Sequence, residues 1–454
     1  MSLYARLAAQ VAARPEAPAL VFEGRTWTYA QFDAEIESAR ERLATQGLGR
    51  GQAVGWLGWN SVALLAMLFA CARSRLCFVP LNARLAVRER AAIARHAGLA
   101  VCHADAGFEV PTLDGTTDPG EPDDLLLAYT SGTTGRARCA VHTQAAMCAN
   151  LDAAFDAQHF DASTRSLAVL PLFHVGGLCI QVLPTLAAGG VVNLHSRFDA
   201  GTWLADVQAW RPTTSLLVPA TMQALTLHPQ WAAADLSSLA FVNAGSSIIA
   251  RPLIDAFHAR GVPVCQVYGA TETGPVTLVL KPEEALAHPG SVGRPALGVE
   301  VRLVEGEVQV RAPNLARGYL RDPDSPAFAG GWFRSGDLAR IDAAGYYRIV
   351  GRLSERIISG GENIDPAEIE QVALADPAVA EAAVVGVADA RWGEVPVLAV
   401  VLRAGATADL NRLRLSFATQ LARFKSPRRI VVLDALPRTA LGKVSKGELA
   451  QSLA

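Results

Sequence analysis

The chain has 454 residues, of which 51% are hydrophobic and 19% are charged, and its formal net charge is -2. This composition is typical of a globular enzyme and disfavours both a disordered chain and a binder of polyanions, so we expect no nucleic-acid partner. The length fits about three domain-sized units, or equally one large α/β unit with a smaller one.

Cysteine usage and the N-terminal segment both indicate a cytoplasmic protein. The seven cysteines are scattered and never form a C-x-x-C pair, which favours reduced, mostly buried thiols over a zinc site or a disulfide framework. Residues 1–15 lack the apolar core and cleavage pattern of a secretion signal. The most apolar stretch, residues 62–72, is too short to cross a bilayer, so we expect no stable membrane insertion.

The first predicted elements alternate between strand and helix. Residues 19–22 and 26–29 flank Glu23-Gly24-Arg25, which predicts a hairpin because glycine permits a tight turn. A helix follows, since Thr28 and Gln31 form a capping-box pattern and apolar residues then recur at helical spacing. Strands are next predicted at 54–57, 77–81 and 101–103, and helices at 62–72 and 87–96.

The alternation continues along the chain and predicts an α/β fold of layered sheets with flanking helices. Further strands are expected at 125–129, 166–170, 191–194, 214–218, 240–243 and 264–267. From Ser291 onward, short β segments predict a β subdomain over 291–350. A Ser/Gly-rich stretch then leads to a charged helix from Pro366 and a final α/β run. We therefore predict an N-terminal domain at 1–353 and a small α+β domain at 354–454.

The first motif with clear chemistry follows the predicted strand at 125–129. The strand runs directly into Thr130-Ser131-Gly132-Thr133-Thr134-Gly135, which supplies two glycines and four hydroxyls. Glycines let backbone N–H groups converge on one point and hydroxyls add donors, which favours phosphate binding. The Gly-Lys-Ser/Thr ending of a P-loop is missing, and Val141-His142 predicts a second strand in place of the P-loop helix. Taken alone, such a loop is more often a plain connection.

Five further motifs follow this loop. They are Pro171-Leu172-Phe173-His174, Tyr268-Gly269-Ala270-Thr271-Glu272, Gly331-Trp332-Phe333 with Gly336-Asp337, Gly351-Arg352 and Gly442-Lys443. In this order they make nearly the whole chain resemble the adenylate-forming enzymes, the superfamily of acyl-CoA synthetases, peptide-synthetase adenylation domains and luciferases. The resemblance implies a C-terminal domain that is mobile relative to the N-terminal core. It also implies Mg²⁺ as the cofactor and ATP and CoA as co-substrates.

The resemblance also assigns the ATP site. The positions that match nucleotide-binding residues are Thr130, Ser131, Gly132, Thr133, Thr134, Gly135, Arg138, Gly245, Ser246, Tyr268, Gly269, Asp337 and Arg352. Tyr268 would lie against adenine, and Asp337 with Arg352 would bind the ribose hydroxyls, which need an acceptor and a multivalent donor. The matched catalytic residues are Thr271, Glu272 and Lys443. Glu272 would hold magnesium, Thr271 would lie near the α-phosphate, and Lys443 would reach in from the C-terminal domain.

Three other assignments come from the same resemblance. The acyl pocket would include His174, Gly269 and Ala270. His174 stands where peptide-synthetase domains carry an aspartate for the substrate amino group, which disfavours an amino acid substrate; a structural histidine is the alternative. The turn formed by Ser359, Gly360 and Gly361 would line the pantetheine tunnel for CoA, and Ser354 would be the hinge between the domains.

The sequence departs from the family pattern at the downstream half of the phosphate loop. Ala137, Arg138 and Cys139 replace the usual Pro-Lys-Gly, so we expect altered contacts to pyrophosphate: arginine keeps the charge but not the geometry of lysine, and cysteine adds a side chain. Ser354 replaces the usual Asp or Lys of the hinge, and Gln144 stands where histidine is frequent.

The sequence therefore predicts an AMP-forming acid–CoA ligase that acts on a medium-chain, long-chain fatty or aromatic carboxylic acid. The short chain and the segment Ala140-Val141-His142-Thr143 are similar to o-succinylbenzoate–CoA ligases. A monomer or a homodimer is expected. Two alternatives stay open: a stand-alone adenylation enzyme that loads a carrier protein, and a degenerate nucleotide-binding relative that has lost the reaction.

Overall fold

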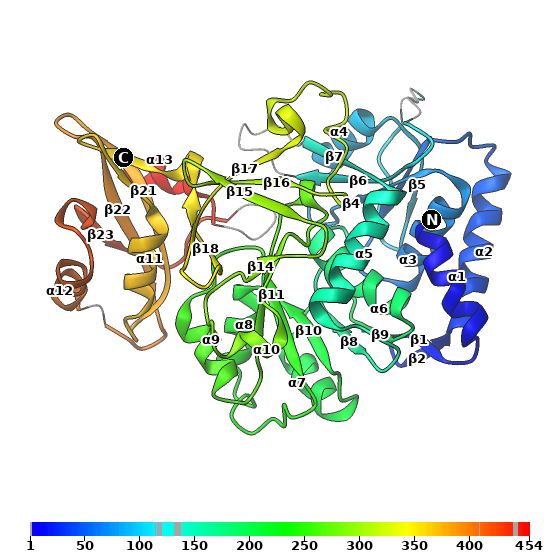
Figure 1. Ribbon diagram of the computed structural model, residues 1–454, viewed down its shortest axis with the longest axis horizontal. Coiled ribbons are helices and arrows are strands. Elements are labelled where there is room, and N and C mark those ends of the chain that lie inside the picture. Colours follow the sequence, from blue (N-terminus) through cyan, green and yellow to red (C-terminus); the bar gives the residue numbers. More distant parts are fainter. Residues whose placement is uncertain (1, 114, 116–119, 131–137, 408, 439–443) are drawn as a thin grey trace.

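The fold is taken from a computed structural model that describes residues 2–113, 115, 120–130, 138–407, 409–438 and 444–454. Within these residues the strands form four sheets, and helices cover them, as Figure 1 shows. The predicted α/β class of layered sheets is confirmed. The predicted hairpin is also present, with Glu23 and Gly24 at positive φ in its turn, and the capping box of Thr28 and Gln31 forms in full.

The largest sheet has the strand order β14-β13-β12-β11-β10-β8-β9-β1-β2. Its strands are β1 (Pro18–Phe22), β2 (Arg25–Thr28), β8 (Arg165–Ala168), β9 (Val191–Leu194), β10 (Thr214–Leu217), β11 (Phe241–Gly245), β12 (Val264–Tyr268), β13 (Leu278–Val279) and β14 (Arg294–Pro295). The strands from β12 through β11, β10, β8 and β9 to β1 are parallel, so their carboxyl ends lie along one edge. This edge is where ligands bind in open α/β sheets.

Helices cover both faces of this sheet. The helices α7 (Ala200–Ala209), α8 (Pro219–Thr226) and α9 (Arg251–His258) pack on one face, and α5 (Gln144–Gln158) with the π-helix η1 (Gly176–Val182) packs on the other. The helix α6 (Leu183–Ala188) continues directly from η1, and α10 (Pro282–Ala285) is a short turn after β13.

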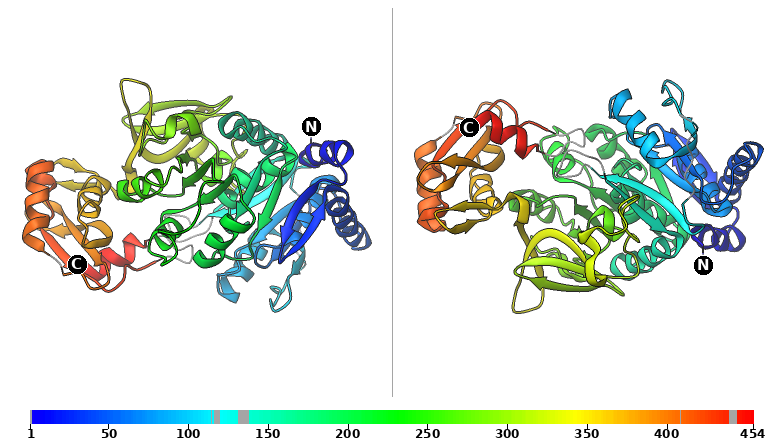
Figure 2. Two further views of the ribbon diagram at one scale, coloured as in Figure 1. Left: turned by 90° about the horizontal axis from the view of Figure 1, so that it is seen from below. Right: turned by 90° about the horizontal axis from the view of Figure 1, so that it is seen from above.

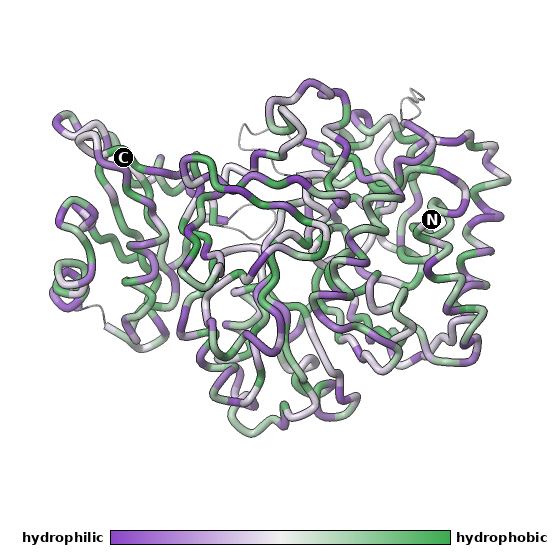
Figure 3. The backbone as a smooth tube through the Cα atoms, in the orientation of Figure 1, coloured by the Kyte–Doolittle hydropathy of each residue, from purple (hydrophilic) through white to green (hydrophobic). Residues whose placement is uncertain are grey.

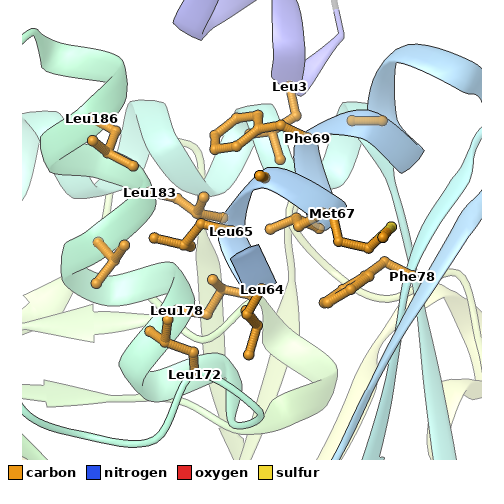
Figure 4. Close-up of a cluster of buried hydrophobic side chains, with 14 of the residues drawn as sticks. Leu3, Leu64, Leu65, Met67, Phe69, Phe78, Leu172, Leu178, Leu183 and Leu186 are labelled. Atoms are coloured by element: carbon orange, nitrogen blue, oxygen red, sulfur yellow. The ribbon is translucent and has the colours of Figure 1, made fainter. Parts of the chain in front are cut away.

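The second α/β unit is a sheet in the order β5-β3-β4-β6-β7. Its strands are β3 (Ala53–Leu57), β4 (Cys77–Leu81), β5 (Leu99–Ala104), β6 (Asp124–Thr130) and β7 (Arg138–Thr143), and its helices are α1 (Leu3–Ala13), α2 (Tyr29–Thr45), α3 (Val62–Ser74) and α4 (Val87–Ala97). Figure 4 shows α3 wedged between the two units, with Leu64 and Leu65 against Leu178 and Leu183 and with Met67 facing Phe78. This shared core joins the two sheets.

The third sheet is antiparallel and lies between the α/β units and the C-terminal part (Figure 1). Its strands are β15 (Glu300–Val304), β16 (Glu307–Arg311), β17 (Phe333–Ile341) and β18 (Tyr347–Arg352). The 3₁₀ helix η3 (Pro326–Gly331) precedes β17, whereas the 3₁₀ helix η2 (Thr271–Thr273) lies between β12 and β13. Asp337 of β17 pairs directly with Arg352 of β18 in the register of the sheet. The end of this sheet therefore carries two of the predicted ATP-binding residues.

The C-terminal residues form a fourth sheet at one end of the molecule (Figure 2). Its strands are β19 (Ile357–Ser359), β20 (Glu362–Ile364), β21 (Val379–Asp389), β22 (Gly393–Leu402) and β23 (Arg429–Val432), after the short helix η4 (Leu353–Glu355). The helices α11 (Pro366–Leu374) and α12 (Leu410–Gln420) cover one face and α13 (Lys446–Leu453) the other, with η5 (Arg423–Lys425) between α12 and β23. Separate apolar clusters on its two faces give this part a core of its own.

Hydropathy follows this layering. Figure 3 shows hydrophobic stretches concentrated in the interior strands and helices, whereas hydrophilic stretches mark loops and outer helices. Within the described residues, no helix combines the length and the apolar character that a membrane span requires.

Candidate active site

A hydrogen-bonded corner forms where β12, β17 and β18 meet. The Tyr268 hydroxyl donates to Asp337 Oδ2 at 2.9 Å, and Arg352 Nε donates to Asp337 Oδ1 at 2.7 Å. Asp337 is 6% exposed, so its carboxylate is fixed from both sides. Burial, with the nearby charge of Asp337, raises the pKa of Tyr268 well above its usual range, which keeps the phenol protonated as a donor. These three predicted ATP-binding residues therefore lie together.

Two of the predicted glycines are required by packing of the backbone. A Cβ on Gly269 would lie 1.7 Å from the carbonyl oxygen of Pro275, and a Cβ on Gly245 would lie 2.4 Å from that of Val267. The chain cannot approach itself this closely with a side chain present. The next residue after Gly245, Ser246, is exposed and has a φ of +76°, a backbone conformation that non-glycine residues seldom adopt. The carboxyl end of β11 is thus a tight and specific turn.

Glu272 is held by a segment far away in the chain. Its Oε1 accepts a hydrogen bond of 2.7 Å from the Tyr319 hydroxyl, and its backbone carbonyl accepts one of 2.8 Å from Ala316 N. Glu272 is 9% exposed. Burial, with the nearby Glu272 charge, raises the pKa of Tyr319, so Tyr319 remains a donor to the carboxylate. Tyr319 could not be predicted, because a single tyrosine outside a recognised motif does not indicate a site.

Thr271 is supported by a histidine, His142, to which the sequence assigned no role in the site. His142 of β7 lies 2.7 Å through Nε2 from the backbone carbonyl of Thr271 and is 1% exposed. Burial lowers the pKa of His142 to about 4, although the bond to Thr271 opposes this shift. The ring is therefore neutral near pH 7 and carries its proton on Nε2, since only a protonated nitrogen can donate to a carbonyl. Ala270, which precedes Thr271, is half-buried.

The phosphate loop itself joins β6 to β7. Thr130 and Arg138 at its two ends are paired across these antiparallel strands, and the predicted second strand after the loop is confirmed as β7. Ser131, Gly132, Thr133, Thr134 and Gly135 lie outside the described residues. Arg138 is exposed, and its guanidinium carbon lies 5.2 Å from the centre of the Tyr319 ring. The cation at the end of the loop thus contacts the tyrosine that holds Glu272.

The expectation for Cys139 is wrong. Its side chain is 1% exposed and packs with Leu127 and Val141 in the core of the β3–β7 sheet, because successive residues of a strand point to opposite faces. Cys139 therefore adds no side chain on the side to which Arg138 points. Gln144, the other departure in this region, is also structural: it accepts from Leu3 N at 3.1 Å and donates to the Ala72 carbonyl at 2.8 Å.

His174 lies two residues before the π-helix η1. Its ring contacts Phe173 edge-on, with centroids 4.7 Å apart, and the residue is half-buried. A run of π-helical turns is rare and often marks a functional site. The second residue of η1, Gly177, has no room for a side chain, because a Cβ would lie 2.5 Å from the carbonyl oxygen of Pro171. The predicted acyl-pocket histidine thus lies in the turn that leads into a π-helix.

The predicted CoA turn is the tight connection between β19 and β20. Gly360 and Gly361 have positive φ values of +59° and +85°, whereas Ser359 ends β19 in extended conformation. A Cβ on Gly360 would lie 2.6 Å from the ring of Trp392, and Gly360 N donates to the Trp392 carbonyl at 2.8 Å. Trp392, which was not predicted from the sequence, therefore packs against this turn.

The predicted hinge residue lies in the 3₁₀ helix η4, which a lysine of α13 contacts. Ser354 is exposed within η4. Lys443 lies outside the described residues. The neighbouring Lys446 has a structural role: its Nζ lies 2.8 Å from Glu355 Oε2 and 2.9 Å from Glu370 Oε1. Lys446 thereby ties α13 to η4, next to the predicted hinge, and to α11.

Comparison with known proteins relates this geometry to one family. The family model described as AMP-binding enzyme matches residues 7–118 and 104–320, and the model of the AMP-binding enzyme C-terminal domain matches residues 368–443. The chain is 38% identical to an indoleacetate–CoA ligase of Aromatoleum aromaticum, with 97% of this chain and 96% of the relative covered. It is also 38% identical to a feruloyl-CoA synthase of Amycolatopsis, covering 96% of each.

A solved structure supports the same relationship. The o-succinylbenzoate–CoA synthetase of Bacillus subtilis, in complex with ATP and a magnesium ion, superimposes with a TM-score of 0.87 at 29% identity. The match covers 99% of both chains. Both parts of the present chain, the α/β units and the C-terminal sheet, therefore have counterparts in that structure.

Proposed function

The chain belongs to the AMP-binding enzyme family, as an acid–thiol ligase, and we propose that it joins an aromatic carboxylic acid to CoA through an acyl-adenylate. The observation that carries this proposal is a pair of fixed carboxylates near the carboxyl end of β12: Asp337 accepts a hydrogen bond from Tyr268, the last residue of that strand, and Glu272 follows the strand in the chain. The aromatic class of the acid is supported by the names of the two relatives at 38% identity, which act on indoleacetate and on ferulate.

Asp337 and its neighbours are assigned to the nucleoside. Arg352 and Tyr268 each occupy one oxygen of Asp337, and a carboxylate has about four lone-pair sites, so two remain for the ribose hydroxyls. Tyr268, which donates to Asp337, is assigned to adenine. The turn at Gly245 and Ser246 completes the assigned nucleotide site.

Glu272 fits a magnesium ion that is shared with the nucleotide. The described residues contain no group of three or more His, Cys, Asp or Glu side chains that could hold a metal alone. Magnesium is commonly bound by one or two carboxylates together with substrate phosphates, which matches a single fixed carboxylate beside a phosphate loop. When bound there, the ion would neutralise charge on the phosphates.

The reaction has two steps. A carboxylate oxygen of the acid attacks the α-phosphorus of ATP, and the bond to the β-phosphate oxygen breaks to release pyrophosphate. The CoA sulfur, which loses its proton, then attacks the acyl carbon and AMP leaves. We assign Thr271 to the α-phosphate and Lys443 to the carboxylate and α-phosphate, because positive and hydrogen-bonding groups fixed at this centre stabilise the charge that develops there.

The second step is assigned to another surface of the C-terminal part. Ser359, Gly360 and Gly361 are proposed to line the path of the thin pantetheine chain, with domain 354–454 rotating on domain 1–353 about Ser354. His174, Gly269 and Ala270 are proposed to border the acyl group. The open space at the position of a Cβ on Gly361 favours this role, because a thin ligand can pass close to the backbone there.

An acid panel tests the proposal. Indole-3-acetate, ferulate, benzoate, octanoate and palmitate are incubated with ATP and Mg²⁺, and AMP, pyrophosphate and thioester are measured with and without CoA. Aromatic acids should give AMP and a CoA thioester. Turnover of fatty acids alone would refute the aromatic class, transfer to a carrier protein but not to CoA would refute the acceptor, and ATP binding without AMP from any acid would indicate a degenerate relative.

The variant Lys443→Ala tests the division of labour. It should abolish adenylate formation while retaining thioester formation from supplied acyl-adenylate. Equal loss of both steps would contradict the assignment of Lys443 to the first step and the rotation of the C-terminal domain.

A further inference from the structure

The segment 316–320 forms an extra edge beside β7. Val141 N donates to the Gly318 carbonyl at 3.1 Å, Arg317 N donates to the Val141 carbonyl at 2.9 Å, and Leu320 N donates to the Cys139 carbonyl at 2.9 Å. The segment is also anchored by Arg317, which makes two hydrogen bonds of 2.7 and 2.8 Å to the buried Asp124. Tyr319 therefore has a fixed backbone beside the end of the phosphate loop.

The Tyr319 side chain is held between a cation and an aromatic ring. Its ring meets Phe328 edge-on, with centroids 5.4 Å apart and planes at 76°, and the Arg138 guanidinium lies over it. Tyr319 is 7% exposed, whereas Arg138 is exposed. The hydroxyl at the far end of this ring is the one that donates to Glu272. Arg138, Tyr319 and Glu272 thus form a continuous chain of contacts.

We propose that Tyr319 and Arg138 are positioning residues for Glu272, with Arg138 fixing the Tyr319 ring and the Tyr319 hydroxyl aiming the carboxylate at the magnesium of Mg-ATP. The inference rests on the proposed function of Glu272. It gives a reason for arginine at position 138: a planar guanidinium stacks on an aromatic face, whereas the compact ammonium of lysine matches that face less well. Arginine in place of the usual lysine at position 138 then helps to hold the carboxylate of Glu272.

The test is a double-mutant cycle of Tyr319→Phe and Arg138→Lys. The Tyr319→Phe change removes the hydroxyl but leaves the ring, and Arg138→Lys keeps the charge but loses the plane. Binding of Mn²⁺ in the presence of α,β-methylene-ATP, which cannot transfer AMP to an acid, is measured from the spectrum of free Mn²⁺ by electron paramagnetic resonance. The Mg²⁺ half-saturation of adenylation and the KM and kcat for ATP are measured in parallel.

We expect Tyr319→Phe to weaken Mn²⁺ binding roughly tenfold or more, the effect typical of losing a partner that orients a metal ligand. Arg138→Lys should weaken it about threefold in the native background, as for an exposed cation–π contact. In the Tyr319→Phe background Arg138→Lys should have no further effect on Mn²⁺, because the path to Glu272 is cut. Additive effects, or unchanged Mn²⁺ binding in Tyr319→Phe, would overturn the proposal.

The chain provides a matched control. Tyr346 donates to Glu284 Oε1 at 2.9 Å and lies under Arg294 at 4.2 Å, which reproduces the Arg–Tyr–Glu arrangement away from the candidate site. Tyr346→Phe should leave Mn²⁺ binding unchanged. Binding of the analogue is also measured in EDTA, without metal, to detect a direct contact of Arg138 with phosphate. If that contact exists, Arg138→Lys should weaken metal-free binding in both the native and the Tyr319→Phe backgrounds. If the native protein neither binds Mn²⁺ with the analogue nor forms AMP, the proposed function fails; if it does both, only the positioning role is at issue.

Discussion

Some residues of the site are required by the packing of the backbone and not by the chemistry of the reaction. Gly269 is the strictest case, since a Cβ there would overlap the Pro275 carbonyl oxygen at 1.7 Å. We expect Gly269→Ala to destabilise the protein by about 1–3 kcal/mol or more, because the backbone must move to admit the methyl group. Denaturant unfolding measures this change.

The comparison for Gly269→Ala is Gly447→Ala. Gly447 lies in α13 and has open space around the position of a Cβ, so alanine there should be neutral or slightly stabilising. Equal stability of the two variants would show that the backbone near Pro275 adapts without strain.

His142 makes a pH-dependent contribution to stability. Its pKa in the folded protein, about 4, lies below the value of about 6.5 expected in the unfolded chain. Between these values the unfolded state binds the proton more strongly, so stability is full above about pH 6.5 and falls as the pH drops toward 4. Between pH 7 and pH 4.5, His142→Gln should lose less stability than the native protein, by on the order of 2 kcal/mol. Parallel acid dependences in urea unfolding would contradict the prediction.

At the scale of elements, the sequence predicted what local patterns encode. The hairpin at Glu23-Gly24, the helix cap at Thr28 and the strand β7 all follow from turn chemistry, side-chain hydrogen bonds and apolar alternation within a few residues. The π-helix η1 was missed because it depends on packing between two sheets. The docking of 316–320 on β7 was missed because the partners are far apart in the chain.

The residues of the site also divide into those that local motifs predict and those that depend on contacts between distant segments. The Tyr268 and Asp337 positions could be predicted from motifs, and the structure brings them together. The supporting residues His142, Tyr319 and Trp392 could not be predicted, because each acts through a contact that only the folded chain creates. A single sequence shows the residues that meet a ligand by their motifs, but it does not show the residues that hold them.

The helix α13 is attached to η4 and α11 through the side chain of Lys446. This lysine stands at the start of α13 between Glu355 and Glu370, and its side chain is 24% exposed. We expect Lys446→Met to destabilise the C-terminal part by about 1–3 kcal/mol, because two partly buried carboxylates are left facing each other. Lys281→Met, which breaks a more exposed pair with Asp156 at 3.0 Å, should cost less than about 1 kcal/mol.

The pH dependence of this effect has a definite sign. Burial alone would lower the pKa of Lys446, but the charges of Glu370 and Glu355 outweigh it and the pKa is raised. The stabilisation is therefore complete below the ordinary value of about 10.4 and is lost as the pH rises through the higher folded value. Thermal unfolding should show a large difference between native and Lys446→Met proteins at pH 8 and a smaller one at pH 11. A difference that does not shrink at pH 11 would contradict the ion-pair explanation.

At the scale of the molecule, polar side chains of the described residues bridge the core and the C-terminal part. Arg340 of β17 lies 2.9 Å from Glu368 of α11, and Gln223 Nε2 donates to the Ala380 carbonyl at 3.2 Å. Figure 2 shows the C-terminal sheet attached at one end of the core, so these contacts lie at the junction. A rotation about Ser354 would have to break them, whereas the core clusters on either side would stay intact.

The Arg340–Glu368 pair therefore tests whether this arrangement is one of two working states. The Arg340 side chain is 68% exposed, so its loss should shift the balance of states by no more than about 1 kcal/mol, or about fivefold. Arg340→Glu, which replaces attraction by repulsion, should change the ratio of adenylation rate to thioester-forming rate by at least as much as Arg340→Ala. Both effects should shrink in 1 M salt, where exposed charges are screened within about 3 Å. The two rates are measured separately, as pyrophosphate exchange and as thioester formation from supplied adenylate. A ratio that stays constant in both variants would mean that the domains do not exchange this contact during turnover.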